Sequence, residues 1–307
     1  MTDPSAGRSR RAAVVVDYDA GVFLADCVRS LEDEGVGELI VVENGDADAA
    51  RATLDTHGLA KTPVIATGRN LGYGAGANRG LAAIEHSEHV LVCNPDLVVH
   101  PGALDRLGSA LDDHLEWAIV GPRILTPEGV AYPSARRFPA PWVAAGHALL
   151  GVLFPNNGFT RRYRTPMLSD RPADVDWVSG ACFLARRSVL EDVGGFDERY
   201  FMFAEDMDLC WRVGRAGWRV GFEPAAVVTH HEGVSRRRHP YRMALAHHRS
   251  ALRFASRTTS GPRRALLPLA ALGLGVRLVA IWSAIVTRRA GSRAQAARPA
   301  QGPTTHP

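Results

Sequence analysis

The stretch AAVVVDY, residues 12–18, decides the fold, because five consecutive apolar residues before the first acid predict a buried β-strand. A helical pattern follows, with apolar residues at three- and four-residue steps: Phe23, Leu24, Cys27, Val28 and Leu31. Further strands are predicted at 38–45, 62–68 and 89–96, and GAGANRGLAAIEHS (74–87) predicts a helix before the last of them. Short apolar strands that alternate with helices favour an α/β fold with a mostly parallel central sheet and flanking helices.

Polar clusters follow three of the predicted strands: DYD at 17–19, ENGD at 43–46 and NPD at 94–96. The carboxyl ends of parallel strands meet at one edge of a sheet, and ligands bind there in open α/β folds. We therefore expect these three clusters to lie together and to form a ligand site.

The segment GYGAGAN, residues 72–78, is only a weak match to a dinucleotide-binding turn. Its spacing is GxGxG followed by Asn78 instead of GxGxxG, and it follows the third predicted strand, so we exclude a Rossmann dehydrogenase. Its glycines allow the backbone to approach a ligand or a neighbouring strand, and Asn70 and Asn78 flank the turn. A tight turn that simply begins a helix explains the same residues equally well.

The segment CNPDLVV places Asp96 directly after a predicted buried strand. A carboxylate at that position can bind a hard metal ion that bridges a diphosphate. Asn94, Pro95 and Asp96 are also common turn residues, and taken alone they fit an ordinary turn better.

The segment RYFMFAEDMDLCWRV, residues 199–213, brings three acids into the start of an amphipathic helix. At 100° per residue, Asp206 falls within the apolar stripe and faces inward. Asp208 falls on the opposite face, where it is expected to form an exposed i,i+4 pair with Arg212. An inward acid at a helix start is a candidate catalytic group, although a helix cap is the simpler explanation.

The composition is that of a globular chain of 307 residues, 46% of them hydrophobic and 22% charged. Its four cysteines are scattered without a CxxC pair, so we expect neither a disulfide framework nor a zinc knuckle, and a reducing compartment. The N-terminal run AAVVV is too short for a signal peptide and is interrupted by Asp17 and Asp19.

The net charge of +4 conceals two oppositely charged segments. Residues 236–307 contain 14 arginines and no other charged residue, whereas residues 1–235 carry 22 basic and 32 acidic groups. The basic segment includes a mostly apolar run at 265–287, interrupted by Pro268 and Arg277. A helix lying in a membrane interface, with arginines reaching anionic headgroups, fits this pattern better than a spanning helix. A buried core helix stays possible, and a disordered nucleic-acid arm would not need the apolar run.

Five motifs occur along the chain in the order seen in family 2 inverting glycosyltransferases. In chain order they are VVENGDAD, NLGYGAGANRGL, VCNPDLVV, SGACFLARRSVLEDVGGFDERYFMFAEDMDLCWRVGRAGW and VVTHHEGVS. The resemblance covers residues 12 to 257 and implies the GT-A fold. It implies a nucleotide-binding half at about 12–125 and an acceptor half at about 126–257. Residues 258–307 would then form a membrane-associating helix and a disordered basic tail.

The resemblance also implies roles for single residues. Asp206 matches the family's general base. Asp96 matches the last acid of its DxD motif and would bind Mg²⁺ or Mn²⁺ with His230, for which His231 is the alternative. Nucleotide-sugar contacts are implied at a larger set: Asp17, Glu43, Asn44, Asn70, Gly72, Asn78, Asn94, Asp96 and Gly180. Two of these depart from the family, since Glu43 replaces an aspartate and Asn94 replaces the first DxD acid.

The acceptor is expected to contact Glu205, Arg136, Arg137 and Trp177. Arginines can hold a diphosphate bidentately, and the basic run at Arg161, Arg162 and Arg164 is a further candidate for this role. A solvated basic loop would account for these arginines just as well.

The resemblance implies a metal-dependent inverting transfer of L-rhamnose from dTDP-L-rhamnose to N-acetylglucosaminyl-diphospho-polyprenol, a step in arabinogalactan–peptidoglycan linker synthesis. Its partners would be that donor, that acceptor and an anionic membrane surface at the cytoplasmic face, with no nucleic acid. Another donor such as UDP-galactofuranose is the alternative within the class. A non-catalytic, membrane-bound protein that binds sugar nucleotides or lipids is the alternative outside it, and the oligomeric state is left open.

Overall fold

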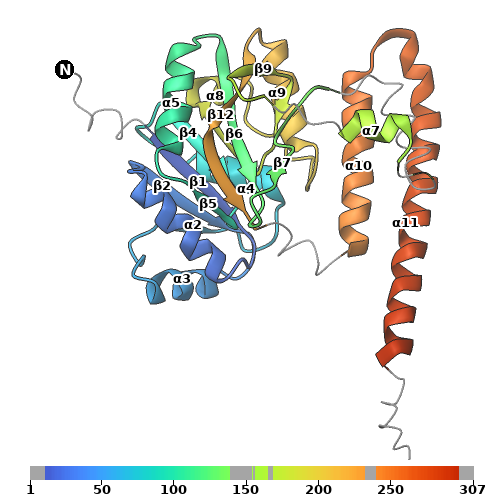
Figure 1. The fold of residues 1–307 in the computed structure, drawn as a ribbon, viewed down its shortest axis with the longest axis horizontal. Coiled ribbons are helices and arrows are strands. Elements are labelled where there is room, and N and C mark those ends of the chain that lie inside the picture. Colours follow the sequence, from blue (N-terminus) through green and yellow to red (C-terminus); the bar gives the residue numbers. More distant parts are fainter. Residues whose placement is uncertain (1–10, 139–153, 155, 165–168, 232–239, 297–307) are drawn as a thin grey trace, which may run out of the picture.

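The computed structural model describes most of the chain and shows a sheet domain beside a helical hairpin (Figure 1). The described residues are 11–138, 154, 156–164, 169–231 and 240–296. The basic tail beyond residue 296 therefore lies outside the described residues.

The first half of the sheet domain alternates strands and helices as the sequence predicts. Its elements are β1 (Arg11–Asp17), α2 (Val22–Asp33), β2 (Glu38–Glu43), α3 (Ala47–Thr56), β3 (Val64–Ala66), α4 (Tyr73–Leu81) and β4 (His89–Cys93). Strand β1 pairs in parallel with β2 on one side and with β4 on the other, and β2 pairs in parallel with β3. All four strands therefore end at the same edge of the sheet.

The second half extends the same sheet with strands of both directions. Its elements are β5 (Leu97–Val99), α5 (Ala103–Asp113), β6 (Trp117–Leu125), β7 (Ala131–Tyr132), β8 (Ala135–Arg136), α7 (Gly158–Arg164), β9 (Ala173–Val175), β10 (Trp177–Val178), β11 (Cys182–Arg186), α8 (Arg187–Asp192), α9 (Glu205–Arg215) and β12 (Arg219–His230). The main strand order is β3-β2-β1-β4-β11-β6-β12-β5. Strand β11 is antiparallel to both neighbours, so it begins at the edge where β4 ends.

Two hydrophobic clusters cover the two faces of the sheet, because successive side chains of a strand point to opposite sides. Ala13 and Val15 of β1 face one cluster, which includes residues from α2, α3 and α5. Val14 and Val16 face the other cluster, which includes residues from α4, α8 and α9. The four cysteines are buried and free.

The chain continues into α10 (Pro240–Thr258), a short 3₁₀ turn η1 (Gly261–Leu266) and α11 (Leu267–Ala296). Helices α10 and α11 pack side by side as a hairpin (Figure 1), with the rings of Tyr241 and Trp282 in edge contact at 6.2 Å. Residues Gly261–Thr287 are long and apolar enough to cross a membrane, and only 6% of that stretch is buried. Leu269, Leu272, Val276 and Val279 of α11 are more than half exposed and share one helix face.

The contact between Gly221 and Trp117 gives a test of the core packing. A Cβ added at Gly221 would lie 2.1 Å from Cε3 of the buried Trp117 ring, whose Nε1 donates to Asp174 Oδ1 at 2.7 Å. We expect Gly221→Ala to lower the free energy of unfolding by about 1–3 kcal/mol in urea titrations. Gly214→Ala in α9 is the matched control, because its Cβ meets nothing within 4 Å, and should be neutral or stabilising. A Gly221→Ala protein as stable as the parent would contradict this packing.

Candidate active site

Asp206 occupies the first turn of α9 and is held by two backbone donors. The Gly180 N–H donates to Oδ2 at 2.8 Å, and the Met207 N–H donates to Oδ1 at 2.8 Å. Gly180 also accepts a hydrogen bond at its carbonyl from the Tyr73 hydroxyl. A Cβ at Gly180 would lie 3.2 Å from Asp206 Cβ and 3.4 Å from the Tyr73 ring, so glycine suits this narrow space. Gly180, expected to touch the donor, here positions the catalytic candidate.

Glu205 precedes Asp206 and is almost fully buried, with 7% of its surface exposed. Burial and the neighbouring Asp206 carboxylate raise the pKa of Glu205 to about 8, so it is protonated at neutral pH. Burial also raises the pKa of Asp206, but its two N–H donors favour the carboxylate. These donors favour Asp206 as the ionised member of the pair, the form that can accept a proton.

The two residues before Glu205 have an unusual backbone. Phe203 and Ala204 both have positive φ, at 69° and 62°, which costs L-residues energy and is found at functional sites. Helix α10 holds this segment, since Ser250 Oγ donates to the Met202 carbonyl at 2.9 Å and His247 packs against Phe203. The position of the acid therefore depends on a helix outside the sheet domain.

Asp208 was expected on an exposed face, and that expectation is wrong. Its side chain is fully buried, and Arg212 Nε lies 2.7 Å from its Oδ2. Arg257 of α10 lies 3.2 Å from Oδ1, and the Tyr200 hydroxyl donates to the same oxygen at 3.3 Å. The i,i+4 pair exists, but it is a buried ion pair because α10 and the preceding loop cover the second face of α9.

Asp17 and Glu43 lie directly opposite each other at the ends of β1 and β2, and each is only 1% exposed. Burial, followed by the Asp17 carboxylate, raises the pKa of Glu43 to about 9. Glu43 Oε2 has no hydrogen-bond donor among the described residues. It is therefore the oxygen that can be protonated and donate a hydrogen bond to Asp17. Burial raises the pKa of Asp17, whereas its contact with Glu43 and the Ala20 N–H, which donates to Asp17 at 3.1 Å, lower it.

The Asn and Gly positions expected at the nucleotide mostly hold loops together. Asn44 donates to the Gly72 carbonyl at 3.1 Å, and Asn70 accepts the Gly72 N–H at 2.9 Å. Asn78 donates to the Phe196 carbonyl at 2.9 Å. A Cβ at Gly72, where φ is +92°, would overlap the Phe201 carbonyl. Glycine is therefore required at position 72 by the backbone of a neighbouring loop, and α4 begins at the next residue.

Asp96 and His230 meet at the edge where β4 ends. His230 Nε2 lies 3.0 Å from Asp96 Oδ1 and 3.2 Å from Asn94 Nδ2, and the buried Nδ1 has no partner among the described residues. His231 contributes its N–H to the Asp96 carbonyl, while its ring packs against Phe23. The geometry thus favours His230 over His231 as the side chain that acts with Asp96.

These residues fit a metal that is held largely by its substrate. The described residues contain no group of three or more His, Cys, Asp or Glu side chains placed to hold a metal. Mg²⁺ typically takes one or two protein carboxylates and completes its shell with phosphate oxygens and water. Asp96 with His230 matches that requirement, and the imidazole suits Mn²⁺ as well.

The expected acceptor residues separate into two groups. Arg136 stacks on the Trp177 ring at 5.3 Å. Burial raises the pKa of Asp206, and the positive charge of Arg136 lowers it by a smaller amount. Arg136 and Trp177 therefore lie near Asp206. Arg137 instead pairs with Asp176 at 3.2 Å. Arg161 is exposed on α7, and the side chains of Arg162 and Arg164 lie outside the described part of the structure.

Comparison with known proteins assigns this constellation to a family. The family described as "Glycosyltransferase like family 2" matches residues 9–251. The chain belongs to this family of glycosyltransferases. It is 37% identical to the N-acetylglucosaminyl-diphospho-decaprenol L-rhamnosyltransferase of Mycobacterium tuberculosis over 267 residues, covering 83% of this chain and 86% of that protein. The expectation from the motifs is confirmed.

Solved glycosyltransferases share the fold. The mannosyltransferase PcManGT from Pyrobaculum calidifontis, solved with GDP-Man and Mn²⁺, matches with a TM-score of 0.53 and 14% identity over 92% of this chain and 75% of that one. GalNAc-T7, solved with UDP, GalNAc and Mn²⁺, matches with a TM-score of 0.55 and 14% identity over 72% of this chain and 42% of that one. At this identity the likeness concerns the fold alone, and it confirms the expected α/β architecture.

In this glycosyltransferase, sequence reasoning missed Tyr73 and the supporting role of α10. Tyr73 is buried, its hydroxyl meets Gly180, and burial raises its pKa well above the ordinary value. An aromatic residue with a polar tip between the glycines of GYGAGAN was the available signal. No comparable signal linked α10 to the catalytic acid.

Asp206→Asn and Asp208→Asn should separate chemistry from stability. If Asp206 accepts the acceptor's proton, Asp206→Asn should lower kcat by about 10²–10⁴-fold with the fold intact. Asp208→Asn should instead cost about 3–5 kcal/mol of unfolding free energy, because it leaves Arg212 and Arg257 facing a neutral group, with kcat within a few fold of the parent. Steady-state kinetics and urea titration distinguish the two, and equal losses of kcat would contradict the assignment.

The Asp17–Glu43 pair should make stability depend on pH. The pKa of Glu43 in the folded chain lies above the ordinary value of 4.5, so folding retains a proton that the unfolded chain releases. Stability should therefore fall as the pH rises from about 4.5 to about 9. Glu43→Gln should flatten this fall, whereas Glu32→Gln on the exposed side of α2 should not. Unfolding free energies measured across that range test the idea, and an unchanged slope in Glu43→Gln would refute it.

Proposed function

We propose that this chain transfers L-rhamnose from dTDP-L-rhamnose to N-acetylglucosaminyl-diphospho-polyprenol, with inversion at the anomeric carbon. The observation that carries the proposal is Asp206, a carboxylate fixed by two N–H donors beside Arg136 and Trp177, in a chain of family 2. The choice of sugar and lipid is supported by the likeness to the mycobacterial rhamnosyltransferase over most of both chains.

Asp206 would act as the general base. An acceptor hydroxyl held in line attacks the anomeric carbon while the bond from that carbon to the donor's diphosphate breaks. The hydroxyl proton passes to Asp206, and the nucleoside diphosphate leaves with the bonding electron pair. Glu205, neutral at pH 7, can donate a hydrogen bond to the sugar without competing for the proton.

Trp177 is a second acceptor contact. Its indole N–H is buried and has no acceptor among the described residues, which costs energy unless a ligand supplies one. β10 pairs with β8 at Trp177 and Arg136, and the chain then runs to Gly180, which holds Asp206. A sugar hydroxyl near Asp206 could therefore accept the Trp177 hydrogen bond.

The donor would lie along the sheet edge, from Asp17 and Glu43 to Asn94 and Asp96. Asp96 and His230 would hold Mg²⁺ or Mn²⁺, which when bound supplies positive charge to the departing diphosphate. Asp17 and Glu43, at the ends of β1 and β2, would border the nucleoside end of the donor.

Helix α11 would bring the enzyme to the cytoplasmic face of the membrane. Its exposed leucines and valines form an apolar face that a soluble monomer rarely shows. A lipid acceptor stays in the bilayer by about 0.8 kcal/mol per CH₂ group, so the enzyme must approach the membrane instead. In this division, residues 1–257 catalyse and residues 258–307 anchor the chain.

Incubation with a panel of nucleotide sugars and a short-chain polyprenyl-diphosphate-GlcNAc tests the function, with product mass as the readout. We expect rhamnose addition from dTDP-L-rhamnose that is lost in excess chelator. Transfer only from another donor, such as UDP-galactofuranose, would replace the donor assignment. Binding of sugar nucleotides without turnover of any would favour a non-catalytic protein.

Charged substitutions in the full chain test the membrane anchor. Leu269→Asp with Val276→Asp should abolish most sedimentation with anionic vesicles, since a central aspartate costs about 2.5–3.5 kcal/mol on insertion. Activity on a short, water-soluble acceptor should persist. Leu115→Asp with Val130→Asp is the control, because both side chains are exposed on the sheet domain. If both double variants sediment as well as the parent, α11 is not the anchor.

A further inference from the structure

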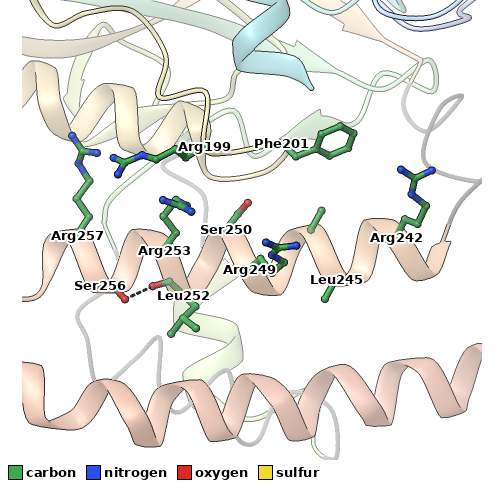
Figure 2. A pocket seen from close by; sticks show the side chains of 11 residues that line it. Arg199, Phe201, Arg242, Leu245, Arg249, Ser250, Leu252, Arg253, Ser256 and Arg257 are labelled. Atoms are coloured by element: carbon green, nitrogen blue, oxygen red, sulfur yellow. Dashed lines mark hydrogen bonds between the residues drawn. The ribbon is translucent and has the colours of Figure 1, made fainter. Parts of the chain in front are cut away.

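A groove of about 790 Å³ separates the sheet domain from α10 (Figure 2). One wall is the segment from Arg199 to Phe201, which leads directly into Glu205 and Asp206. The other wall is formed by residues of α10, from Arg242 to Arg257 along the helix (Figure 2). The groove is thus lined by the segment that precedes the proposed catalytic acid and by the first helix of the hairpin.

Arginine dominates the lining of this groove, and none of the eleven lining residues is acidic. The arginines are Arg199, Arg242, Arg249, Arg253 and Arg257. Two of them are neutralised from outside the groove, because Arg199 pairs with Asp197 and Arg257 pairs with both Asp197 and Asp208. The groove therefore holds more positive charge than its neighbouring carboxylates balance.

Arg242, Arg249 and Arg253 have no carboxylate partner among the described residues. Their spacing of seven and four residues places them within about 40° on the helix and over about 16 Å along it. Like charges at this spacing repel one another, so the stripe costs stability in the free protein. Arg253 is nevertheless kept in place over the Tyr200 ring, at 5.8 Å from its centre. A retained, unbalanced stripe of this kind is best explained by an anion that binds it.

The remaining lining identifies the kind of anion. Guanidinium groups bind phosphate oxygens bidentately, and successive arginines suit two linked phosphates. Phe201, Leu245 and Leu252 supply apolar walls beside the arginines. The exposed apolar face of α11 lies on the adjoining helix of the hairpin. A ligand with a diphosphate joined to a hydrocarbon chain matches all three features.

We propose that this groove binds the diphosphate of the polyprenyl acceptor, an inference that rests on the proposed function. The arginine stripe holds the diphosphate, the isoprenoid chain leaves along the hairpin, and the sugar lies toward Asp206. Arg136 then serves the sugar end, and Arg137, which is paired with Asp176, is not needed for the diphosphate. This assignment places the diphosphate site on α10 instead of on the loop arginines that the sequence suggested.

The test is the full-length triple variant Arg242→Gln, Arg249→Gln and Arg253→Gln. Its KM for a short-chain diphosphate acceptor should rise by at least about tenfold, because charge-assisted hydrogen bonds are lost. Its activity on a GlcNAc glycoside without diphosphate should match that of the parent. The matched control changes three exposed arginines of the sheet domain to glutamine: Arg79, Arg106 and Arg215. An unchanged KM in the stripe variant would overturn the proposal.

Two further measurements distinguish the acceptor diphosphate from phospholipid headgroups as the anion bound by the stripe. They also distinguish failure of this proposal from failure of the proposed function. With the donor site saturated by nucleoside diphosphate, calorimetry should show pyrophosphate binding to the parent and not to the stripe variant. Pyrophosphate binding can be measured even if the parent transfers no sugar. Calorimetry therefore tests the diphosphate site independently of the proposed function. If the variant loses anionic vesicles yet keeps its KM and its pyrophosphate binding, the stripe serves phospholipid headgroups and the acceptor proposal is wrong.

Discussion

The buried carboxylate of Asp208 connects the parts of the molecule that form the site. It pairs with Arg212 on its own helix and with Arg257 at the end of α10. Arg212 extends the connection by donating to the carbonyls of Val193 and Gly195, both at 2.6 Å. A buried carboxylate is stable only when such partners surround it, so α9, the loop before it and α10 hold one another in place. That arrangement holds α10, which lines the groove, against the loop that precedes Asp206.

The sheet explains why residues distant in sequence meet at one edge. Parallel pairing of β1 with β2 and β4 brings Asp17, Glu43 and Asn94 to the same side. The reversed strand β11 begins where β4 ends, so the Asn94 N–H donates to the Ala181 carbonyl at 2.9 Å and Gly180 reaches Asp206. β12 runs parallel to β6 and ends at His230 on this edge. One edge therefore collects the residues proposed to hold the donor, the metal and the acceptor's proton.

Sequence patterns predicted the strands and the polar edge, because these follow from strand periodicity. The helical wheel was less accurate for α9, where Asp206 is half-buried and the neighbouring Glu205 and Asp208 are the buried acids. The error at Asp208 has a definite cause. A helical wheel assigns one apolar face to the core, whereas α9 is covered on a second face by Arg257 and Tyr200 through long-range contacts. The same limit applies to Asn44 and Asn78, whose amides fit a ligand or a loop equally well until the neighbouring backbone is known.

The position of Arg257 has a consequence for the order in which the chain becomes functional. Strands β1 to β4 can pair once the first 93 residues are available, and the N-terminal part of a chain is synthesised first. Asp197 and Asp208, by contrast, find a common partner only when the end of α10 has been synthesised. The segment with positive φ at Phe203 and Ala204 then has its full set of contacts. A growing chain would thus lack part of the contacts that hold the segment before Asp206 until the last residues before the apolar helix emerge.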